Sequence, residues 1–397
     1  MGDRVGPAVG ASASGRGLVR RRRRRWARIT GFGAAGLLVV GVGAGWAVYA
    51  KLSGNITPDE AAAAELRRYE KERPTSLVRG ARNILLIGSD SRRGEDNARY
   101  GRDSGTERSD TTILLHLSAG RKSATAVSLP RDLMVSLPGC RRPDGSRSAP
   151  RTAMFNQAFQ VGGSACTIRT VEKLTGIRVD HHVVVDFHGF KEMVDAIDGV
   201  EVCLREPIDD RAAKLRLPAG RVTLDGEQAL GYVRVRKSLG DGSDTERMER
   251  QQRFLGALVN KVRSNDVLLN PAKLYPVLDA ATSSLTTDPD LASLRGLYEL
   301  VRGLRDIPME KVQFLTVPRE SYAHDSNRDQ LVEPEADRLF QRLRTDAPVV
   351  VAKGAPRDSA QRGPAGDAHA GPFAPPSVAV SPPPTFRGNT AAEDTCE

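Results

Sequence analysis

The chain has 397 residues, with 59 Lys and Arg against 49 Asp and Glu, which gives a formal net charge of +10. With 39% apolar and 27% charged residues the chain can bury a core, so wholesale disorder is excluded. Four cysteines in this length exclude a disulfide-rich mini-scaffold, and the composition also excludes collagen, a coiled coil and a polytopic membrane protein. The length fits two or three domains, or one large domain with tails.

The positive charge is concentrated at the N-terminus. Residues 1–30 contain nine arginines and a single acidic residue, Asp3, so this segment carries +8 and the remaining 367 residues carry +2. The basic character is therefore a property of one end. It does not make the folded part a nucleic-acid binder, and we expect no nucleic-acid partner.

An uncharged segment, residues 29–50 (ITGFGAAGLLVVGVGAGWAVYA), follows the arginines. Its length as a helix is about 33 Å, enough to cross a hydrocarbon core of about 30 Å. The positive-inside rule places residues 1–28, a basic segment, in the cytoplasm and the chain after Lys51 outside the cell membrane. A cleaved signal peptide is the alternative interpretation, because the last three residues of the segment resemble a cleavage site. Both interpretations give an extracytoplasmic domain.

Two glycine patterns occur in this segment. Residues 31–36 match GxGxxG, but no strand precedes them and no βαβ unit follows, so a dinucleotide site is not supported. Gly41 and Gly45 form GxxxG, which permits two membrane helices to pack closely as a homodimer. The alternative is that glycine is simply common in membrane helices.

Beyond the membrane segment the chain predicts a stalk, a large domain and a tail. Residues 51–81 are interpreted as an extracytoplasmic stalk with a helix over 58–72. Strands are then predicted at 83–88, 112–117, 124–129, 181–186, 200–204 and 312–317, and helices at 165–174, 189–197, 246–262, 290–304 and 335–344. Their alternation favours an α/β layered domain over 82–346. Residues 347–397 are rich in Pro, Ala and Gly and are predicted to be disordered.

The four cysteines permit three full pairings, and disulfides are favourable outside the membrane. We favour Cys140–Cys166, because both residues lie in loop-like surroundings that flank one segment. Cys203 lies in a strand pattern and is interpreted as a buried thiol. No cysteine or histidine spacing indicates zinc.

Asp and Arg side chains gather at the ends of the predicted elements. In open α/β sheets ligands bind at the carboxyl ends of strands, so these side chains are expected to converge. Helical spacing places Arg247, Arg250 and Gln251 on one face. The candidates are Asp90 and Arg92, Arg108 and Asp110, Arg131 and Asp132, Arg234 and Arg236, and the helix residues Arg247, Arg250 and Gln251.

This set of side chains suits a phosphorylated ligand. Arginine offers a planar, permanently charged fork for phosphate oxygens. Two carboxylates without other ligands suit Mg²⁺, which takes its remaining ligands from phosphates and water. The alternative is that each Arg–Asp pair is a structural salt bridge. No GxxxxGK[ST] or GxSxG motif supports a P-loop or a serine hydrolase.

The segments NILLIGSDSR, ERSDTTILL, AVSLPRDLMV, DHHVVVDFHGF, LDGEQALGYVRVR and DTERMERQQRF, in this order behind one membrane helix, resemble the LytR-CpsA-Psr family. The resemblance covers residues 82–265, and the Arg-rich start and Pro-rich tail are similar to actinobacterial members. It implies a three-layer αβα sandwich with a mixed central sheet and an apolar pocket for a lipid. It also implies a phosphotransferase that moves a glycopolymer from a polyprenyl-pyrophosphate carrier onto a peptidoglycan sugar hydroxyl.

The resemblance also implies roles for single residues. Asp90 and Asp110 match the Mg²⁺-site aspartates, with Mn²⁺ as the alternative metal. Arg131, Arg234 and Arg236 match arginines that contact the pyrophosphate and are the expected catalytic residues. Less defined phosphate-binding roles fall to Arg92, Arg108, Arg247, Arg250 and Gln251. Asp132 is expected to hold its loop. The apolar residues considered for the lipid pocket are Phe159, Phe190, Val194, Phe254, Leu255 and Leu258, for which ordinary core packing is the alternative.

Three hypotheses follow. The first is a Mg²⁺-dependent, membrane-anchored glycopolymer–peptidoglycan phosphotransferase whose partners are the lipid-linked glycopolymer, peptidoglycan and the membrane. The second is a non-catalytic module that binds polyprenyl-phosphate lipids during cell-wall assembly. The third, a DNA-binding regulator, is disfavoured because arginines beside a membrane helix are explained by topology and anionic lipid.

Overall fold

The computed structural model describes residues 2, 38–89, 109–211, 213–235, 244–264, 271–352, 384–393 and 396. The chain divides into two compact units, Met1–Leu52 and Ser53–Glu397. In the first unit, residues 38–52 are helical, which covers the second half of the predicted membrane segment; residues 29–37 lie outside the described residues. Within the described part of the chain, no helix has the length and apolar character needed to cross a membrane.

The second unit is built on a nine-stranded sheet with both parallel and antiparallel neighbours, so the predicted α/β class with a mixed central sheet is confirmed. The central pairs are β2 with β3 and β3 with β4, both antiparallel, while β7 and β13 run parallel to β2 and β4. In spatial order the strands are β1 (Thr57–Pro58), β12 (Leu285–Thr287), β7 (His181–Val185), β2 (Arg82–Ser89), β3 (Ser109–Leu117), β4 (Ala124–Leu129), β13 (Val312–Thr316), β17 (Thr385–Thr390) and β16 (Val350–Ala352).

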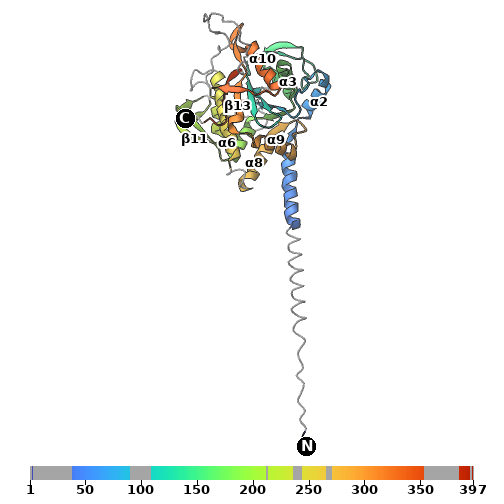
Figure 1. Ribbon diagram of the computed structural model, residues 1–397, viewed down its shortest axis with the longest axis vertical. Coiled ribbons are helices and arrows are strands. Elements are labelled where there is room, and N and C mark those ends of the chain that lie inside the picture. The colour runs from blue at the N-terminus through green and yellow to red at the C-terminus, as the bar shows by residue number, and fades with distance from the viewer. Residues whose placement is uncertain are drawn as a thin grey trace, which may run out of the picture. The chain divides into compact units, whose positions relative to one another are not determined.

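Helices cover both faces of this sheet (Figure 1). Alternate residues of a strand point to opposite faces, and β2 shows the result: Leu85 and Ile87 belong to one buried cluster and Ile84 to another. The first cluster includes residues of α2 (Glu60–Arg68), α3 (Gln157–Thr175) and α10 (Glu333–Arg344), and the second is covered by residues of α6 (Asp244–Arg263) and α9 (Leu294–Arg305).

A third buried cluster, which we call the second core, lies beside the sheet. Leu224, Ala229 and Phe254 are among its buried residues. It is formed by helices and two short hairpins, which are α4 (Phe187–Ala196), α5 (Gly226–Arg234), part of α6, β8 (Val200–Leu204) with β11 (Gly220–Leu224), and β9 (Ile208–Asp210) with β10 (Leu215–Leu217). Next to it lies α8 (Pro271–Ser283), and two further hairpins, β5 (Met134–Leu137) with β6 (Arg151–Met154) and β14 (Arg319–Tyr322) with β15 (Asp325–Leu331), complete the unit.

Several predicted elements extend beyond their expected bounds. The helix expected at 165–174 is the second part of α3, which begins at Gln157 and carries non-helical backbone at Gly162 and Gly163. The helix predicted for the stalk also differs from the prediction. Ala62 and Leu66 of α2 are buried in the same cluster as β2, so α2 is a packed element of the domain and not part of a free stalk.

The tail prediction is wrong for two segments. β16 and β17 are strands of the main sheet, and β17 pairs with β13 through Gln313↔Thr390. Phe386 is buried among core residues, which explains why this segment is ordered despite the composition around it. Residues 353–383 lie outside the described residues.

All four cysteines are in disulfides. Cys140 and Cys166, the favoured pair, are joined with their Cα atoms 5.6 Å apart. Cys203 pairs with Cys396 across 193 residues of sequence, so the interpretation of Cys203 as a thiol is corrected. Cys203 lies in β8, opposite Arg221 of β11.

Candidate active site

A cavity of about 370 Å³ lies where the main sheet meets the second core. Five of the residues predicted from separate sequence motifs line it: Asp110, Arg131, Arg234, Arg247 and Gln251. The other lining residues are Thr111, Phe187, Asp210, Ala213, Leu230 and Val233. The expected convergence of polar residues from distant strands and helices is therefore present for these five.

Asp110 reaches the cavity because the β2–β3 ladder is irregular at this point. Gly88 is opposite Thr111 and Ser89 is opposite Ser109, which leaves Asp110 as the extra residue of a bulge. Bulges change the direction of a side chain at the end of a ladder. A glycine at position 88 allows this close approach. A Cβ there would lie only 3.3 Å from the Cβ of Thr111, which is closer than an ordinary contact.

Arg131 follows β4 and lies between two carboxylates. Its Nη1 donates to Oδ1 of Asp110 at 2.9 Å, and its Nε lies 3.3 Å from Oδ2 of Asp132. The backbone carbonyl of Asp132 also accepts from the amide of Asp329 in β15, which ties the segment after β4 to that strand. Two ion pairs thus fix the guanidinium of Arg131 at the edge of the cavity.

Arg234 is the last residue of α5, and its Cζ lies 4.8 Å from the centre of the Phe187 ring, a cation–π contact. The neighbouring backbone is held by α6. Nε2 of Gln251 donates to the carbonyl of Val233 at 3.2 Å, and Nη2 of Arg250 donates to the carbonyl of Val235. The two bonds fix the C-terminal end of α5 on both sides of Arg234.

Arg247 and Arg250 are buried, with 5% and 4% of their surface exposed, yet they serve different purposes. Arg247 lines the cavity, whereas Arg250 contacts the backbone after α5 and is absent from the lining. Burial lowers the pKa of Arg250, which nevertheless stays charged because a guanidinium group is a very strong base. Arg250 is therefore a positioning residue, and its predicted direct role in phosphate binding is corrected.

Four predicted site residues, Asp90, Arg92, Arg108 and Arg236, lie outside the described residues. The apolar residues considered for a lipid pocket do not line the cavity. Val194 and Phe254 are buried in the second core, and Phe159 in the first cluster of the sheet, so ordinary core packing applies to them.

The apolar wall consists instead of Phe187, Ala213, Leu230 and Val233. Phe187 had a sequence signal, because it directly follows a predicted strand whose carboxyl end meets the same edge of the sheet. Asp210 had none. It reaches the cavity only because the β9–β10 hairpin packs beside α5, and its Oδ1 accepts from the amide of Ala213 at 3.0 Å.

The chemistry of the cavity is that of an anion site with an apolar side. Its lining holds three guanidinium groups and two carboxylates. Arginine forks bind phosphate oxygens in two-point contacts, and the apolar wall can cover a hydrocarbon attached to the phosphate. In the class of α/β proteins with an open sheet, a cavity at the ends of the central strands is the usual place for a ligand.

The chain belongs to the LytR_cpsA_psr family, whose model matches residues 51–345. Among curated relatives, it is 39% identical over 230 residues to a probable cell wall biosynthesis protein LcpB from Corynebacterium glutamicum, covering 56% of this chain and 52% of that protein. It is 30% identical to the polyisoprenyl-teichoic acid–peptidoglycan teichoic acid transferase TagT from Bacillus subtilis, covering 61% and 76%. The chain spans about half the length of the two Corynebacterium glutamicum proteins it matches.

The fold is similar to that of solved structures. The crystal structure of Bacillus subtilis TagV is 25% identical, with a TM-score of 0.53 over 68% of this chain and 100% of TagV. The LytR-Csp2A-Psr enzyme from Actinomyces oris is 22% identical, with a TM-score of 0.53 over 68% of this chain and 93% of that chain. The second likeness supports the fold alone.

Proposed function

We propose that this protein transfers a glycopolymer from a polyprenyl-pyrophosphate carrier onto a sugar hydroxyl of peptidoglycan. The observation that carries the proposal is the cavity itself, where Arg131, Arg234 and Arg247 meet beside an apolar wall. A polyprenyl pyrophosphate has the matching two parts, a charged diphosphate and a long hydrocarbon. The names of the relatives, which include cell-wall biosynthesis proteins and teichoic acid transferases, agree with this reaction.

In the proposed reaction the acceptor hydroxyl oxygen attacks the phosphorus that carries the glycan. The bond from that phosphorus to the bridging oxygen breaks, and polyprenyl phosphate leaves with the electron pair. One of the aspartates, Asp90 or Asp110, takes the hydroxyl proton. Arg131 and Arg234 hold the phosphate oxygens, so that catalysis rests on positioning and on charge stabilisation.

The residues that line the cavity supply part of a site for a divalent metal. Within the described residues no group of three His, Cys, Asp or Glu is arranged to hold one. Mg²⁺, however, is commonly held by one or two carboxylates together with substrate phosphates. Asp110 borders the cavity and uses Oδ1 for Arg131, and Asp90 would be the second donor. When bound, Mg²⁺ or Mn²⁺ would neutralise charge on the pyrophosphate.

We also propose that residues 29–50 anchor the protein in the cell membrane, with residues 1–28 cytoplasmic and the domain extracytoplasmic. The uncharged segment behind a run of arginines supports this topology. The presence of two disulfides agrees, because disulfides persist in oxidising compartments. Protease treatment of intact cells, stripped of their wall, should degrade the domain and spare the N-terminal segment.

The test of the activity uses the full-length protein in detergent, a polyprenyl-pyrophosphate-linked glycan and peptidoglycan fragments, with and without Mg²⁺. Mass spectrometry follows polyprenyl phosphate and ligated product. Metal-dependent product that is lost in Asp110→Ala supports the transferase. Tightly bound lipid that is never cleaved, with every glycan and acceptor tried, would instead favour the non-catalytic lipid-binding module.

A further inference from the structure

The loop between β5 and β6 carries an exposed cluster of arginines outside the cavity. We call Arg141, Arg142, Arg147 and Arg151 the basic cluster, and all four are exposed. Within the described residues none of the four forms an ion pair with a carboxylate. The one acidic residue of the loop, Asp144, accepts from the amide of Ser146 at 2.8 Å. The loop therefore keeps a net positive charge.

The backbone places two of these charges directly opposite each other. Arg141 and Arg147 form an isolated antiparallel bridge. Like charges opposite each other on neighbouring strands are destabilising. The guanidinium of Arg147 lies over the ring of Tyr69, with its Cζ 5.4 Å from the ring centre, so a cation–π contact offsets part of this cost and an anion bound at the loop can offset the rest.

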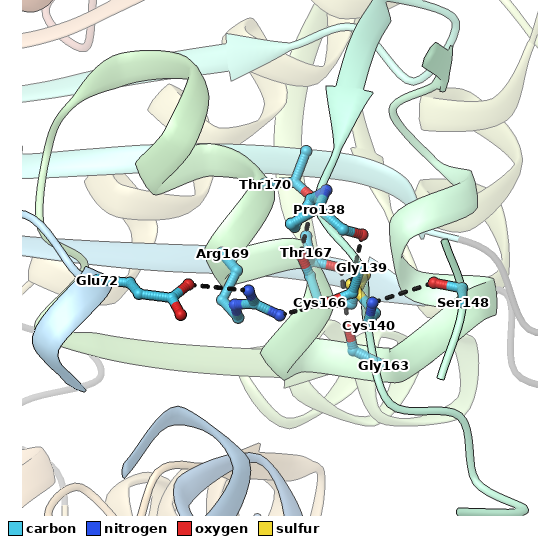
Figure 2. Close-up of a disulfide and its surroundings, with 10 residues drawn as sticks. All are labelled: Glu72, Pro138, Gly139, Cys140, Ser148, Gly163, Cys166, Thr167, Arg169 and Thr170. Carbon is cyan, nitrogen blue, oxygen red and sulfur yellow. Dashed lines mark hydrogen bonds and ion pairs between the residues drawn. A yellow bond between two sulfur atoms is a disulfide. The ribbon is translucent and has the colours of Figure 1, made fainter. Parts of the chain in front are cut away.

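A disulfide and several hydrogen bonds hold the loop against α3, and Figure 2 shows this region. The disulfide joins Cys140 to Cys166 on α3, and the amide of Ser148 donates to the carbonyl of Cys140 at 2.8 Å. Nη1 of Arg169 donates to the carbonyl of Gly139 at 2.7 Å, and its other end points toward Glu72. Such a pre-organised surface loses little conformational entropy when a ligand binds.

A glycine of α3 makes the close approach of the loop feasible. A Cβ at Gly162 would lie 2.7 Å from the carbonyl oxygen of Arg141 and 3.2 Å from the Cβ of Cys140. The helix thus gives up regular geometry at residues 162 and 163 where the loop rests on it. The loop position is built into the helix and is not set by the disulfide alone.

The hairpin connects the basic cluster to the cavity. Its base is tied beside Arg131, whose carbonyl accepts from the amide of Asn156 at 3.0 Å. The ladder then runs from Met134↔Met154 to Leu137↔Arg151. At about 3.3 Å per residue, the cluster lies roughly 15–20 Å from Arg131, a span that a polymer of several repeats can cover.

From these observations we infer that the basic cluster binds a polymer with repeated phosphodiester groups, namely the donor glycopolymer as it extends from the cavity. Arginine forks recognise phosphate oxygens with geometry as well as charge. This inference rests on the proposed function, which places the first phosphates of the donor at Arg131. It adds a second contact that would favour long, anionic donors over short or neutral ones.

The experiment measures binding without turnover. Full-length protein in detergent is titrated with a labelled poly(glycerol phosphate) oligomer and with neutral dextran of similar length, at several salt concentrations. The triple variant Arg141→Ala, Arg142→Ala, Arg147→Ala should weaken oligomer binding at least about tenfold and flatten its salt dependence. The corresponding triple Lys variant should recover part of the affinity, because it keeps the charge without the fork.

A matched control removes three exposed arginines that have acidic partners, through Arg216→Ala, Arg221→Ala and Arg295→Ala. It should change binding less than about twofold, because those charges are already paired. Equal loss in both triples, unchanged binding in the loop triple, or loss of dextran binding to the same extent would overturn the inference. Loss of affinity for muropeptides in place of the oligomer would assign the cluster to the acceptor and also overturn it.

Transfer assays separate this inference from the proposed function. With a short neutral donor, the loop triple should transfer at the wild-type rate, while a long phosphate-rich donor should show a raised KM and unchanged kcat. If the wild-type protein transfers neither donor, the proposed function fails, and the binding titration still decides the role of the basic cluster.

Discussion

Arg131 and Asp110 form an ion pair of 2.9 Å between the segment that follows β4 and the neighbouring strand β3, at the edge of the cavity. Both side chains are partly exposed, at 20% and 32%, so the pair is open to a ligand. Under the proposed function an incoming phosphate would compete with Asp110 for the same guanidinium, and the freed carboxylate could then hold a metal or take a proton. The pair thus offsets the charge of Arg131 and holds its guanidinium fork in place.

Replacement of Arg131 by alanine should reduce transfer at least about 100-fold, because it removes a charged fork from the reacting phosphates. Stability should change by less than about 1 kcal/mol, since partly exposed ion pairs contribute little. Initial rates and denaturant unfolding measure the two effects. Arg131→Lys keeps the charge and loses the fork, so its transfer rate should lie between those of wild type and Arg131→Ala. Transfer within threefold of wild type in Arg131→Ala would contradict the assigned role.

Arg250 should act on activity only through the end of α5. Arg250→Ala leaves the carbonyl of Val235 without its donor and should destabilise the protein by roughly 1–3 kcal/mol. It should also lower kcat by displacing Arg234. Arg253→Ala on the same helix is the control, because Arg253 pairs with Glu249 at the surface and should have little effect. A normal kcat in a folded Arg250→Ala protein would refute the positioning role.

Removal of the Cys140–Cys166 disulfide, by Cys→Ala at both positions, should lower the free energy of unfolding by about 3 kcal/mol, as expected for a closed loop of this length. Both sulfurs are buried, so packing losses add to this effect. Denaturant unfolding of the variant against oxidised wild type gives the difference. If reduction of the wild type costs much more than the double variant, the Cys203–Cys396 bond carries the excess.

Stability at low pH should depend on Asp59. Burial raises the pKa of its carboxyl, but hydrogen bonds from His182 and the amide of Ala62 outweigh burial and hold the pKa below the usual value. The folded state therefore binds fewer protons, so the stabilisation is full above the ordinary aspartate pKa of about 4 and is lost as pH falls through the lower folded value. Asp59→Asn should cost roughly 1 kcal/mol at pH 7 and less below pH 3. Unfolding titrations at both pH values test this, with Asp209→Asn on an exposed strand as control.

The sequence predicted the site better than it predicted the limits of the fold. Strand ends located Asp110 and Arg131, because the amino end of the antiparallel strand β3 lies beside the carboxyl ends of β2 and β4. The prediction that Arg247, Arg250 and Gln251 share one helix face toward the site was only partly correct. At about 100° per residue, Gln251 lies 40° from Arg247 on one side and Arg250 lies 60° from it on the other. The cavity is lined by Arg247 and Gln251 and not by Arg250.

Long-range pairings were beyond sequence reasoning. The bond between Cys203 and Cys396 depends on how a segment 193 residues away returns to the domain. The strand Thr385–Thr390 is six residues long in a Pro-rich region, and pairing with β13 and β16 makes it a strand. The composition of the surrounding residues hides such a short segment, whereas pairing with the sheet determines its structure.

The position of β17 has a consequence for biosynthesis. In the sheet it lies between β13 and β16, although it follows both in the chain. About 70 residues separate the end of β13 from β17, so at roughly 5–20 residues per second the ribosome needs several seconds more to supply it. During that interval β13 presents an open hydrogen-bonding edge, which nascent chains can use for wrong pairings. Folding of this side of the domain is therefore completed only after β17 has been made, and a holding chaperone would be most useful during that interval.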